Sequence, residues 1–204
     1  MAIQEDAILT YRTSNMVLKI LSNPSYLSRP ESCSRVGGHM FIARKDNIPF
    51  NNGVVLNILQ IIQAVISSTA EAELGALFIN EKPAVSMCQA LAELSHPQPH
   101  MSMHTNNATA HALLTNKILP KEVMAMDMCF HWQRYHNAQG QFCYYWRPDT
   151  QNLADYFTKH HPTSHHKSVC PTNITSLNNQ KYRKLFKKST TKENLYHQPK
   201  HQCP

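Results

Sequence analysis

The sequence predicts an α/β domain built on a mixed sheet, followed by a basic, flexible C-terminal tail. Three observations support this prediction. Hydrophobic residues make up 42% of the 204 residues, which is enough for a globular core. Strand-like apolar segments occupy the first third of the chain, and from Thr69 the apolar period changes to that of a helix. Segments typical of helices and strands then alternate, as they do in α/β proteins.

Five segments are typical of strands, because they alternate in polarity or are rich in β-branched and aromatic residues. We expect the pair Asn23-Pro24 to end the first strand, since proline holds the residue before it in an extended or turn conformation. The glycine pair Gly37-Gly38 lies at the entry to the second strand. The predicted strands are residues 16–22, 36–45, 54–67, 101–105 and 141–147.

Four helices are predicted from the apolar period. Thr69 is expected to cap the first helix, and Pro83 to break or kink it. In the third helix, Met128, Trp132 and Tyr135 recur at helical spacing together with Met124, so we expect them to face the core. The predicted helices are residues 69–95, 106–116, 122–136 and 152–159.

Charge and hydropathy limit the partners and the location. The net charge of +7 favours a polyanionic partner such as nucleic acid, although a solvated basic surface explains it equally well. The most apolar stretch, residues 53–66, is shorter than the roughly 20 residues that a membrane span needs. The first residues lack the apolar core of a secretory signal. We therefore predict an intracellular protein, cytoplasmic or nuclear, with no membrane partner.

Four segments together resemble a known family. In the order and spacing that they have here, they are similar to the ribonuclease H-like domain of copia-type LTR retrotransposons, the C-terminal part of the Pol polyprotein. The segments are SNPSYLSRPESCSRVGGHMF, SSTAEAELGAL, HTNNATAHAL and AMDMCFHWQRY…GQFCYYWRPDTQNLADYFTKHH. The resemblance implies a ribonuclease H-like fold with a five-stranded mixed sheet flanked by helices. It also implies a lead-in at residues 1–15 left from the connection to reverse transcriptase, a domain at residues 16–166, and a polar, lysine-rich tail at residues 167–204.

The resemblance further implies a hydrolase that cuts the RNA strand of RNA–DNA hybrids with two Mg²⁺ ions. Two such ions, about 3.5–4 Å apart, activate a water and stabilise the leaving oxygen. Because Mg²⁺ prefers carboxylate oxygen, the family brings four acidic side chains to one place. Their positions in this sequence are Asn23, Glu73, Asn106 and Asp155. The first and third of these depart from the family, which has aspartate there.

Two neutral amides in place of carboxylates predict an inactive or severely impaired enzyme. Each lost charge near a divalent ion costs several kcal/mol at an effective dielectric of about 20, and about 1.4 kcal/mol is a tenfold change in rate. Glu73 and Asp155 would then be vestigial Mg²⁺ ligands, and Mg²⁺ binding weak or lost. Three alternatives stay open: an active or weakly active ribonuclease H that uses the remaining carboxylates, a domesticated non-catalytic module that binds nucleic acid, and a decayed reading frame.

Each of these residues also has a purely structural explanation. Glu73 could be a solvated acid in the first turn of a helix, Asn23 a turn residue and Asn106 part of a helix cap. Asp127 fits a surface or capping position better than that of a substitute ligand. The sequence leaves these explanations open.

Other residues suggest weaker hypotheses. Arg134, Arg147 and Lys159 could track a phosphate backbone and give weak, salt-sensitive binding to an RNA–DNA hybrid or another nucleic acid. The histidines of residues 160–166 suggest zinc, but adjacent histidines point apart and no second pair has finger spacing. The alternating aromatic residues Phe142, Tyr144 and Trp146 fit a core strand better than a base-stacking platform.

Overall fold

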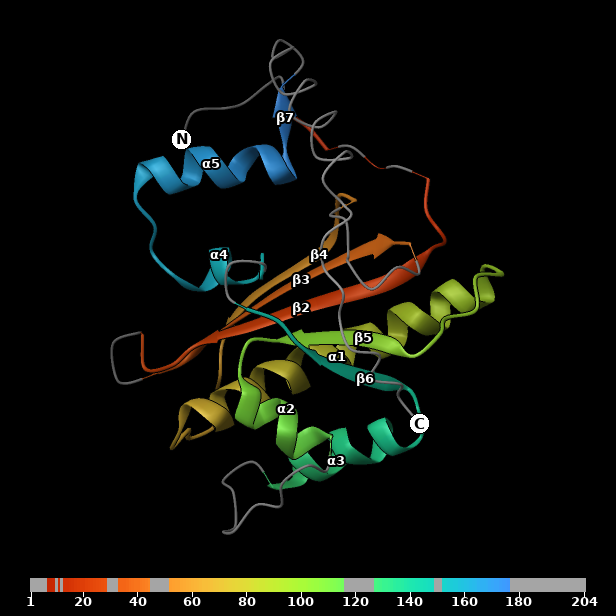
Figure 1. Ribbon diagram of the computed structural model, residues 1–204, viewed down its shortest axis with the longest axis vertical. Coiled ribbons are helices and arrows are strands. Elements are labelled where there is room, and N and C mark those ends of the chain that lie inside the picture. The colour runs from red at the N-terminus through yellow and green to blue at the C-terminus, as the bar shows by residue number, and fades with distance from the viewer. Residues whose placement is uncertain are drawn as a thin grey trace.

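The computed structural model (Figure 1) describes residues 7–9, 11, 13–28, 33–44, 52–115, 127–148 and 152–176. Its centre is a five-stranded mixed sheet with the strand order β4-β3-β2-β5-β6, so the predicted fold class is confirmed. The strands are β2 (Val17–Ser25), β3 (Arg35–Ala43), β4 (Val54–Ile61), β5 (Met101–Thr105) and β6 (Phe142–Trp146). Strands β2, β3 and β4 are antiparallel, whereas β5 runs parallel to both β2 and β6.

Strand β2 is longer than predicted. It continues through the pair Asn23-Pro24 to Ser25, where Asn23 pairs with Gly37 and Pro24 with Val36 of β3. The prediction that this pair ends the strand is wrong. Proline is tolerated at the edge of a sheet, where its missing amide hydrogen breaks no ladder. Strand β5 pairs with β2 only as far as Leu21, so this end of β2 is an edge on that side.

Helix α1 (Thr69–Glu93) is continuous through Pro83, so the predicted break there is also wrong. Buried side chains on both sides of the proline, Leu77 and Ala84, pack into the main core and hold the helix together. The cap is one residue earlier than expected. The hydroxyl of Ser68 accepts a hydrogen bond from the backbone N–H of Glu71, which satisfies one of the free donors of the first turn.

Helices α2 (Ala108–Leu114) and α3 (Asp127–Ala138) follow β5. The predicted buried face of α3 is correct for Trp132, which packs against the main core. It is wrong for Met128 and Tyr135, which are 82% and 61% exposed. The buried residues are Phe130 and Gln133. A pattern of apolar residues could not indicate a polar inward residue, which is stabilised here by its hydrogen bond to Glu81 (3.3 Å). The predicted Met124 lies outside the described residues.

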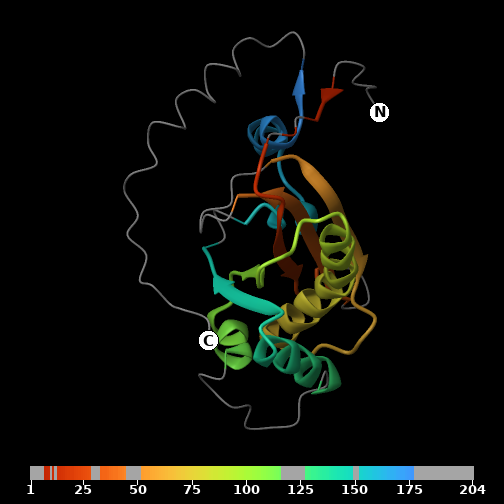
Figure 2. The same cartoon turned by 90° about the vertical axis from the view of Figure 1, so that its right-hand side faces the viewer.

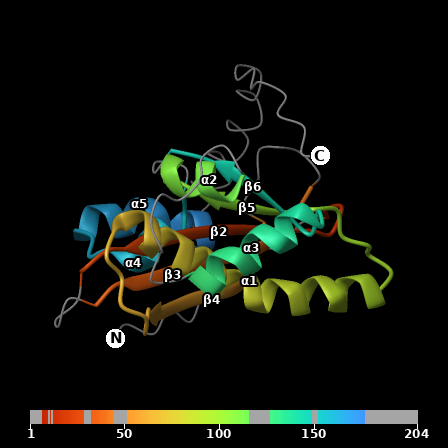
Figure 3. The ribbon, with the colours of Figure 1, turned by 90° about the horizontal axis from the view of Figure 1, so that it is seen from below.

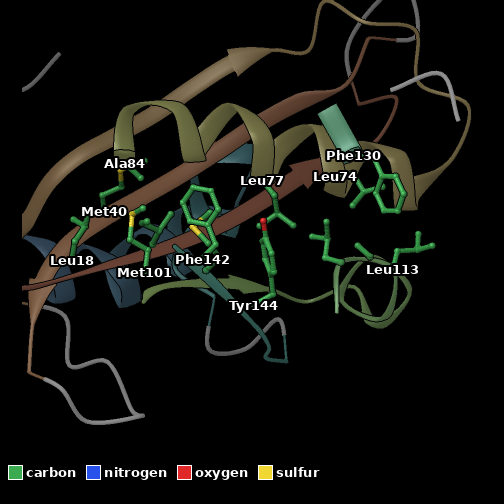
Figure 4. Close-up of a cluster of buried hydrophobic side chains, with 14 of the residues drawn as sticks. Leu18, Met40, Leu74, Leu77, Ala84, Met101, Leu113, Phe130, Phe142 and Tyr144 are labelled. Atoms are coloured by element: carbon green, nitrogen blue, oxygen red, sulfur yellow. The ribbon is translucent and has the colours of Figure 1, made fainter. Parts of the chain in front are cut away.

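Two layers of helices enclose the sheet. Helices α1, α2 and α3 lie on one side, and α4 (Asp155–Thr158) and α5 (Thr163–Asn173) on the other, as Figures 2 and 3 show. The main core fills the space between the sheet and α1 (Figure 4). It consists of side chains from the sheet and from helices α1, α2 and α3, among them Leu18, Met40, Leu74, Leu77, Met103, Phe130, Phe142 and Tyr144.

The ends of the described chain meet in a second, small sheet. Strand β1 (Ala7–Ile8) pairs antiparallel with β7 (Thr175–Ser176). Neither strand was predicted, because each is short and the pairing joins segments from opposite ends of the sequence. Helix α5 runs across the predicted boundary at residue 167, so no break in secondary structure marks it. None of the helices described in the structure combines the length and apolar character that a membrane crossing requires.

Candidate functional site

Asn23 and Asn106 lie next to each other at one edge of the sheet. Strands β2 and β5 are parallel, and Leu21 pairs with His104. Asn23 and Asn106 are each two residues further along their chains, so the same register brings them together. The amide nitrogen Nδ2 of Asn106 donates a hydrogen bond to Oδ1 of Asn23 (2.9 Å).

Asp155, the first residue of α4, lies at the same site, which it reaches from the face of the sheet that α4 covers. Asn23 uses its amide nitrogen twice on this helix, donating to Oδ1 of Asp155 (2.9 Å) and to the hydroxyl of Thr158 (2.9 Å). Asn23 is only 1% exposed. The close approach of α4 depends on Gly37, because a Cβ there would lie 2.7 Å from the backbone oxygen of Ala154.

Glu73 reaches the same edge from helix α1. It is 5% exposed and accepts a hydrogen bond from the hydroxyl of Thr105 (2.9 Å), the residue before Asn106. The alternative that Glu73 is a solvated acid is therefore wrong. Asn23, Asn106 and Asp155 are joined directly by hydrogen bonds, and Glu73 is joined to the residue next to Asn106. We call these four residues the amide site.

A positively charged side chain, that of Lys159, lies beside the amide site. The ammonium nitrogen of Lys159 is 2.5 Å from Oδ1 of Asp155, the same oxygen that accepts from Asn23. Asp155 therefore meets a positive charge and an amide donor at one oxygen. The Lys159 side chain, predicted as a nucleic-acid contact, is still 46% exposed.

The two predicted arginines lie in different places. The Nε of Arg147 donates to Nδ1 of His104 (3.0 Å), two residues before Asn106. Burial, followed by the positive charges of Arg147 and Lys19, holds the pKa of His104 well below its usual value, so this imidazole is neutral. Burial also lowers the pKa of Arg147. Arg134 lies on α3, on the opposite side of the sheet from α4, with its guanidinium 5.3 Å from the ring centre of Phe130.

The aromatic strand divides into two parts. Phe142 and Tyr144 are 1% and 3% exposed, as expected for a core strand, whereas Trp146 is 49% exposed. The indole nitrogen of Trp146 donates to the backbone oxygen of Asn106 (2.9 Å). The prediction of a core role is therefore wrong for Trp146. Trp146 is the last residue of its strand and lies beside Asn106, and the alternating pattern alone could not predict that position.

Three of the histidines of residues 160–166, His161, His165 and His166, form a cluster with Tyr156. The rings of His161 and His165 stack with centres 4.2 Å apart, and the Tyr156 hydroxyl is 2.8 Å from Nδ1 of His166. Stacked rings do not direct their nitrogens at one point, as zinc ligands must. Within the described ranges, no three side chains of histidine, cysteine, aspartate or glutamate are placed to hold a metal ion together.

No protein-family model and no curated protein matches the sequence. Several solved structures are similar in fold. One of them is LC11-RNase H1, isolated from compost by a metagenomic approach. The similarity covers 70% of this chain and 92% of that one, with 11% identity and a TM-score of 0.53. The same protein in complex with an RNA/DNA hybrid gives 12% identity and a TM-score of 0.49 over 69% of this chain and 92% of that one. The N-terminal RNase H domain of rv2228c from Mycobacterium tuberculosis gives 15% identity and a TM-score of 0.49 over 70% and 91%. The first of these likenesses shows that the chain has the ribonuclease H fold.

Proposed function

We propose that this chain is a degenerate ribonuclease H-like domain of copia-type retrotransposon origin, which keeps the fold and binds nucleic acid but cleaves RNA–DNA hybrids poorly or not at all. The observation that carries the proposal is the amide of Asn23, which donates to Asp155 where the family would have a second carboxylate. We assign residues 16–166 to this domain, with residues 1–15 as the remnant of a connection to reverse transcriptase and residues 167–204 as a tail.

The orientation of the Asn23 amide follows from chemistry. A carboxylate can only accept hydrogen bonds, so the group of Asn23 that faces Asp155 must be its amino group. That amino group also donates to Thr158, and its carbonyl oxygen accepts from Asn106. An N–H group cannot ligate a metal ion, so Asn23 presents Asp155 with a donor where a metal pair needs an oxygen.

These residues do not fit a pair of Mg²⁺ ions. A two-metal site needs several anionic oxygens that converge on the ions. The amide site has two carboxylates, and one of them, Asp155, already contacts the ammonium of Lys159. A metal ion that binds Oδ1 of Asp155 would have to displace both the lysine and the amide of Asn23 from that oxygen. We therefore infer that the amide site does not hold the Mg²⁺ pair that hybrid cleavage needs.

Nucleic-acid binding is the part of the ancestral activity that this site could keep. The chain has a net charge of +7, and Lys159 exposes nearly half of its side chain at the edge of the amide site. Contacts between lysine or arginine and phosphates need no metal ion and weaken as salt rises. We propose an RNA–DNA hybrid as the ligand, bound weakly and with a clear dependence on salt.

A cleavage assay tests the loss of activity. The purified chain is incubated with a labelled RNA–DNA hybrid and either Mg²⁺ or Mn²⁺, beside the double variant Asn23→Asp, Asn106→Asp. We expect little or no cleavage by the natural chain and a rate at least about tenfold higher for the double variant, since each restored charge is worth several kcal/mol. Adding Glu73→Gln to the double variant should abolish the gain. Cleavage by the natural chain that disappears with Glu73→Gln alone would instead establish an active enzyme.

A further inference from the structure

Trp146 is an exposed aromatic side chain at the edge of the amide site. It ends strand β6 and pairs with Thr105, the residue between His104 and Asn106. Phe142 and Tyr144, on the same strand at alternate positions, are buried, yet nearly half of the Trp146 surface is open to solvent. The sheet therefore presents a large aromatic ring beside the positions that hold the metal ions in the family that the sequence resembles.

The position of this ring is fixed by the protein. The N–H of an indole is its only polar group, and here it donates to the backbone oxygen of Asn106 (2.9 Å). Asn106 in turn donates to Asn23, and Asn23 to Asp155. A chain of three hydrogen bonds thus connects Trp146 to α4. Because the polar atom is satisfied, the exposed part of the ring is apolar surface without a partner among the described residues.

We propose that Trp146 is a stacking platform for an unpaired base of a nucleic-acid strand bound at the amide site. This inference rests on the proposed function. A base inside a duplex is already stacked on both faces, so only an unpaired base can use an aromatic side chain in this way. The half-exposed Lys159 and the neighbouring Arg147, whose Nε donates to His104, supply positive charge for the backbone of the same strand.

If Trp146 stacks on an unpaired base, the chain should prefer hybrids with unpaired nucleotides over blunt hybrids. A hybrid with a single-stranded extension, or with unpaired nucleotides at a junction, should bind more tightly than a blunt hybrid with the same paired length. Stacking of one base on an aromatic residue is worth about a tenfold change in affinity. An exposed aromatic that merely lies on the surface would give no such difference. Tyr135 on α3, which is 61% exposed, offers a matched control for that case.

The first test measures affinity by fluorescence anisotropy. Blunt and extended hybrids carry the same label and are titrated with the natural chain, Trp146→Leu, Trp146→Phe and Tyr135→Leu. We expect the natural chain and Tyr135→Leu to prefer the extended hybrid about tenfold, Trp146→Leu to lose the preference, and Trp146→Phe to keep most of it. Equal affinity of the natural chain for both hybrids would overturn the inference. An equal loss on both hybrids in Trp146→Leu would overturn it as well, because it would indicate a structural role.

The second test uses the fluorescence of the tryptophan itself. The chain has two tryptophans, and the variant Trp132→Phe leaves only Trp146. We expect the extended hybrid to quench the emission of Trp146 more strongly than the blunt hybrid at saturation. If hybrids bind by anisotropy and the emission does not change, the stacking inference fails while the proposed function stands. If no hybrid or single strand binds at all, the proposed function fails, and the inference with it.

Discussion

The amide nitrogen of Asn23 lies 2.9 Å from Oδ1 of Asp155, although 132 positions separate the two residues in the sequence. This hydrogen bond joins the end of the central strand β2 to helix α4. Two carboxylates at the same distance would repel each other without a cation between them. The asparagine therefore lets the two elements meet without a metal ion, and the first prediction follows from this contact.

We expect Asn23→Asp to make folding depend on divalent cations. The new carboxylate would lose the donors to Asp155 and Thr158 and place a second negative charge in a buried position. Thermal denaturation in EDTA should show a loss of about 1–3 kcal/mol in the free energy of unfolding. Mg²⁺ should restore part of this loss in the variant and leave the natural chain unchanged.

Asn107→Asp is the matched control for this prediction. Asn107 caps α2 by accepting hydrogen bonds from the N–H groups of Thr109 and Ala110. Aspartate caps a helix as well as asparagine does, so the same change of charge one residue from Asn106 should cost little. A similar loss of stability in both variants would mean that net charge, and not the contact with Asp155, is responsible.

The second prediction concerns the ion pair between Lys159 and Asp155. Because the lysine is 46% exposed, Lys159→Ala should change the free energy of unfolding by less than about 1 kcal/mol. The variant should bind the hybrid more weakly, and the slope of log affinity against log salt should become shallower by up to about 1. Lys167→Ala removes the same charge from an exposed position on α5. An equal change in affinity and slope for Lys167→Ala would show that Lys159 has no special contact with the ligand.

Local pattern was sufficient to predict most of the sheet. Strand β5 has the predicted bounds, residues 101–105, because prolines precede it and the pair Asn106-Asn107 follows it. The order of the five strands along the chain was also predicted. The resemblance supplied the positions of the four site residues, and their roles as vestigial ligands stay a prediction.

What the sequence could not reveal depends on contacts between distant residues. The hydrogen bond from Thr105 to Glu73 and the pairing of β1 with β7 join segments with no shared local pattern. The buried face of α3 was mispredicted in part, because its inward residue Gln133 is polar and has a buried partner in Glu81. Apolar periodicity reflects which apolar side chains leave water when the chain folds. It contains no information about such polar pairs.

The third prediction concerns the contact between Gly38 and Asn80. A Cβ on Gly38 would lie 1.9 Å from Oδ1 of Asn80. Asn80 is fully buried, and its Nδ2 donates to the hydroxyl of Ser22 and to the backbone oxygen of Gly37. Gly38→Ala should therefore lower the free energy of unfolding by about 2 kcal/mol in urea denaturation, since a buried clash of this kind forces neighbouring groups apart.

Asn80→Ala supplies the control for this clash. In the double variant Gly38→Ala, Asn80→Ala, the side chain that obstructs the new methyl group is gone. The loss of unfolding free energy in the double variant should therefore be smaller than the sum of the losses in the two single variants. A double-mutant cycle reports this difference directly. Strict additivity would show that Gly38 is needed for another reason.

The fourth prediction is a dependence of stability on pH that comes from Glu81. This residue of α1 is fully buried, and its Oε1 accepts from Tyr144 (2.7 Å) and Gln133 (3.3 Å). Its Oε2 has no hydrogen-bond partner in the part of the chain that the structure describes. Burial raises the pKa of Glu81 to about 8 from an ordinary value of 4.5, and its two hydrogen bonds oppose that rise in part. The folded state thus holds a proton here that the unfolded state releases at a much lower pH.

The sign of the effect follows from this difference in proton binding. Between pH 4.5 and about 8 the folded state binds more protons than the unfolded state, so stability falls as pH rises. The contribution of Glu81 is a loss of about 1.4 kcal/mol for each pH unit in that window. Glu81→Gln keeps an oxygen for Tyr144 and Gln133 and cannot ionise, so the slope due to this residue should vanish. Urea denaturation across this pH window should show that the free energy of unfolding of Glu81→Gln rises relative to that of the natural chain as pH increases. Glu93→Gln changes an exposed position of the same helix, and its free energy of unfolding should follow that of the natural chain at every pH. Parallel curves for Glu81→Gln would mean that the buried carboxyl does not retain its proton.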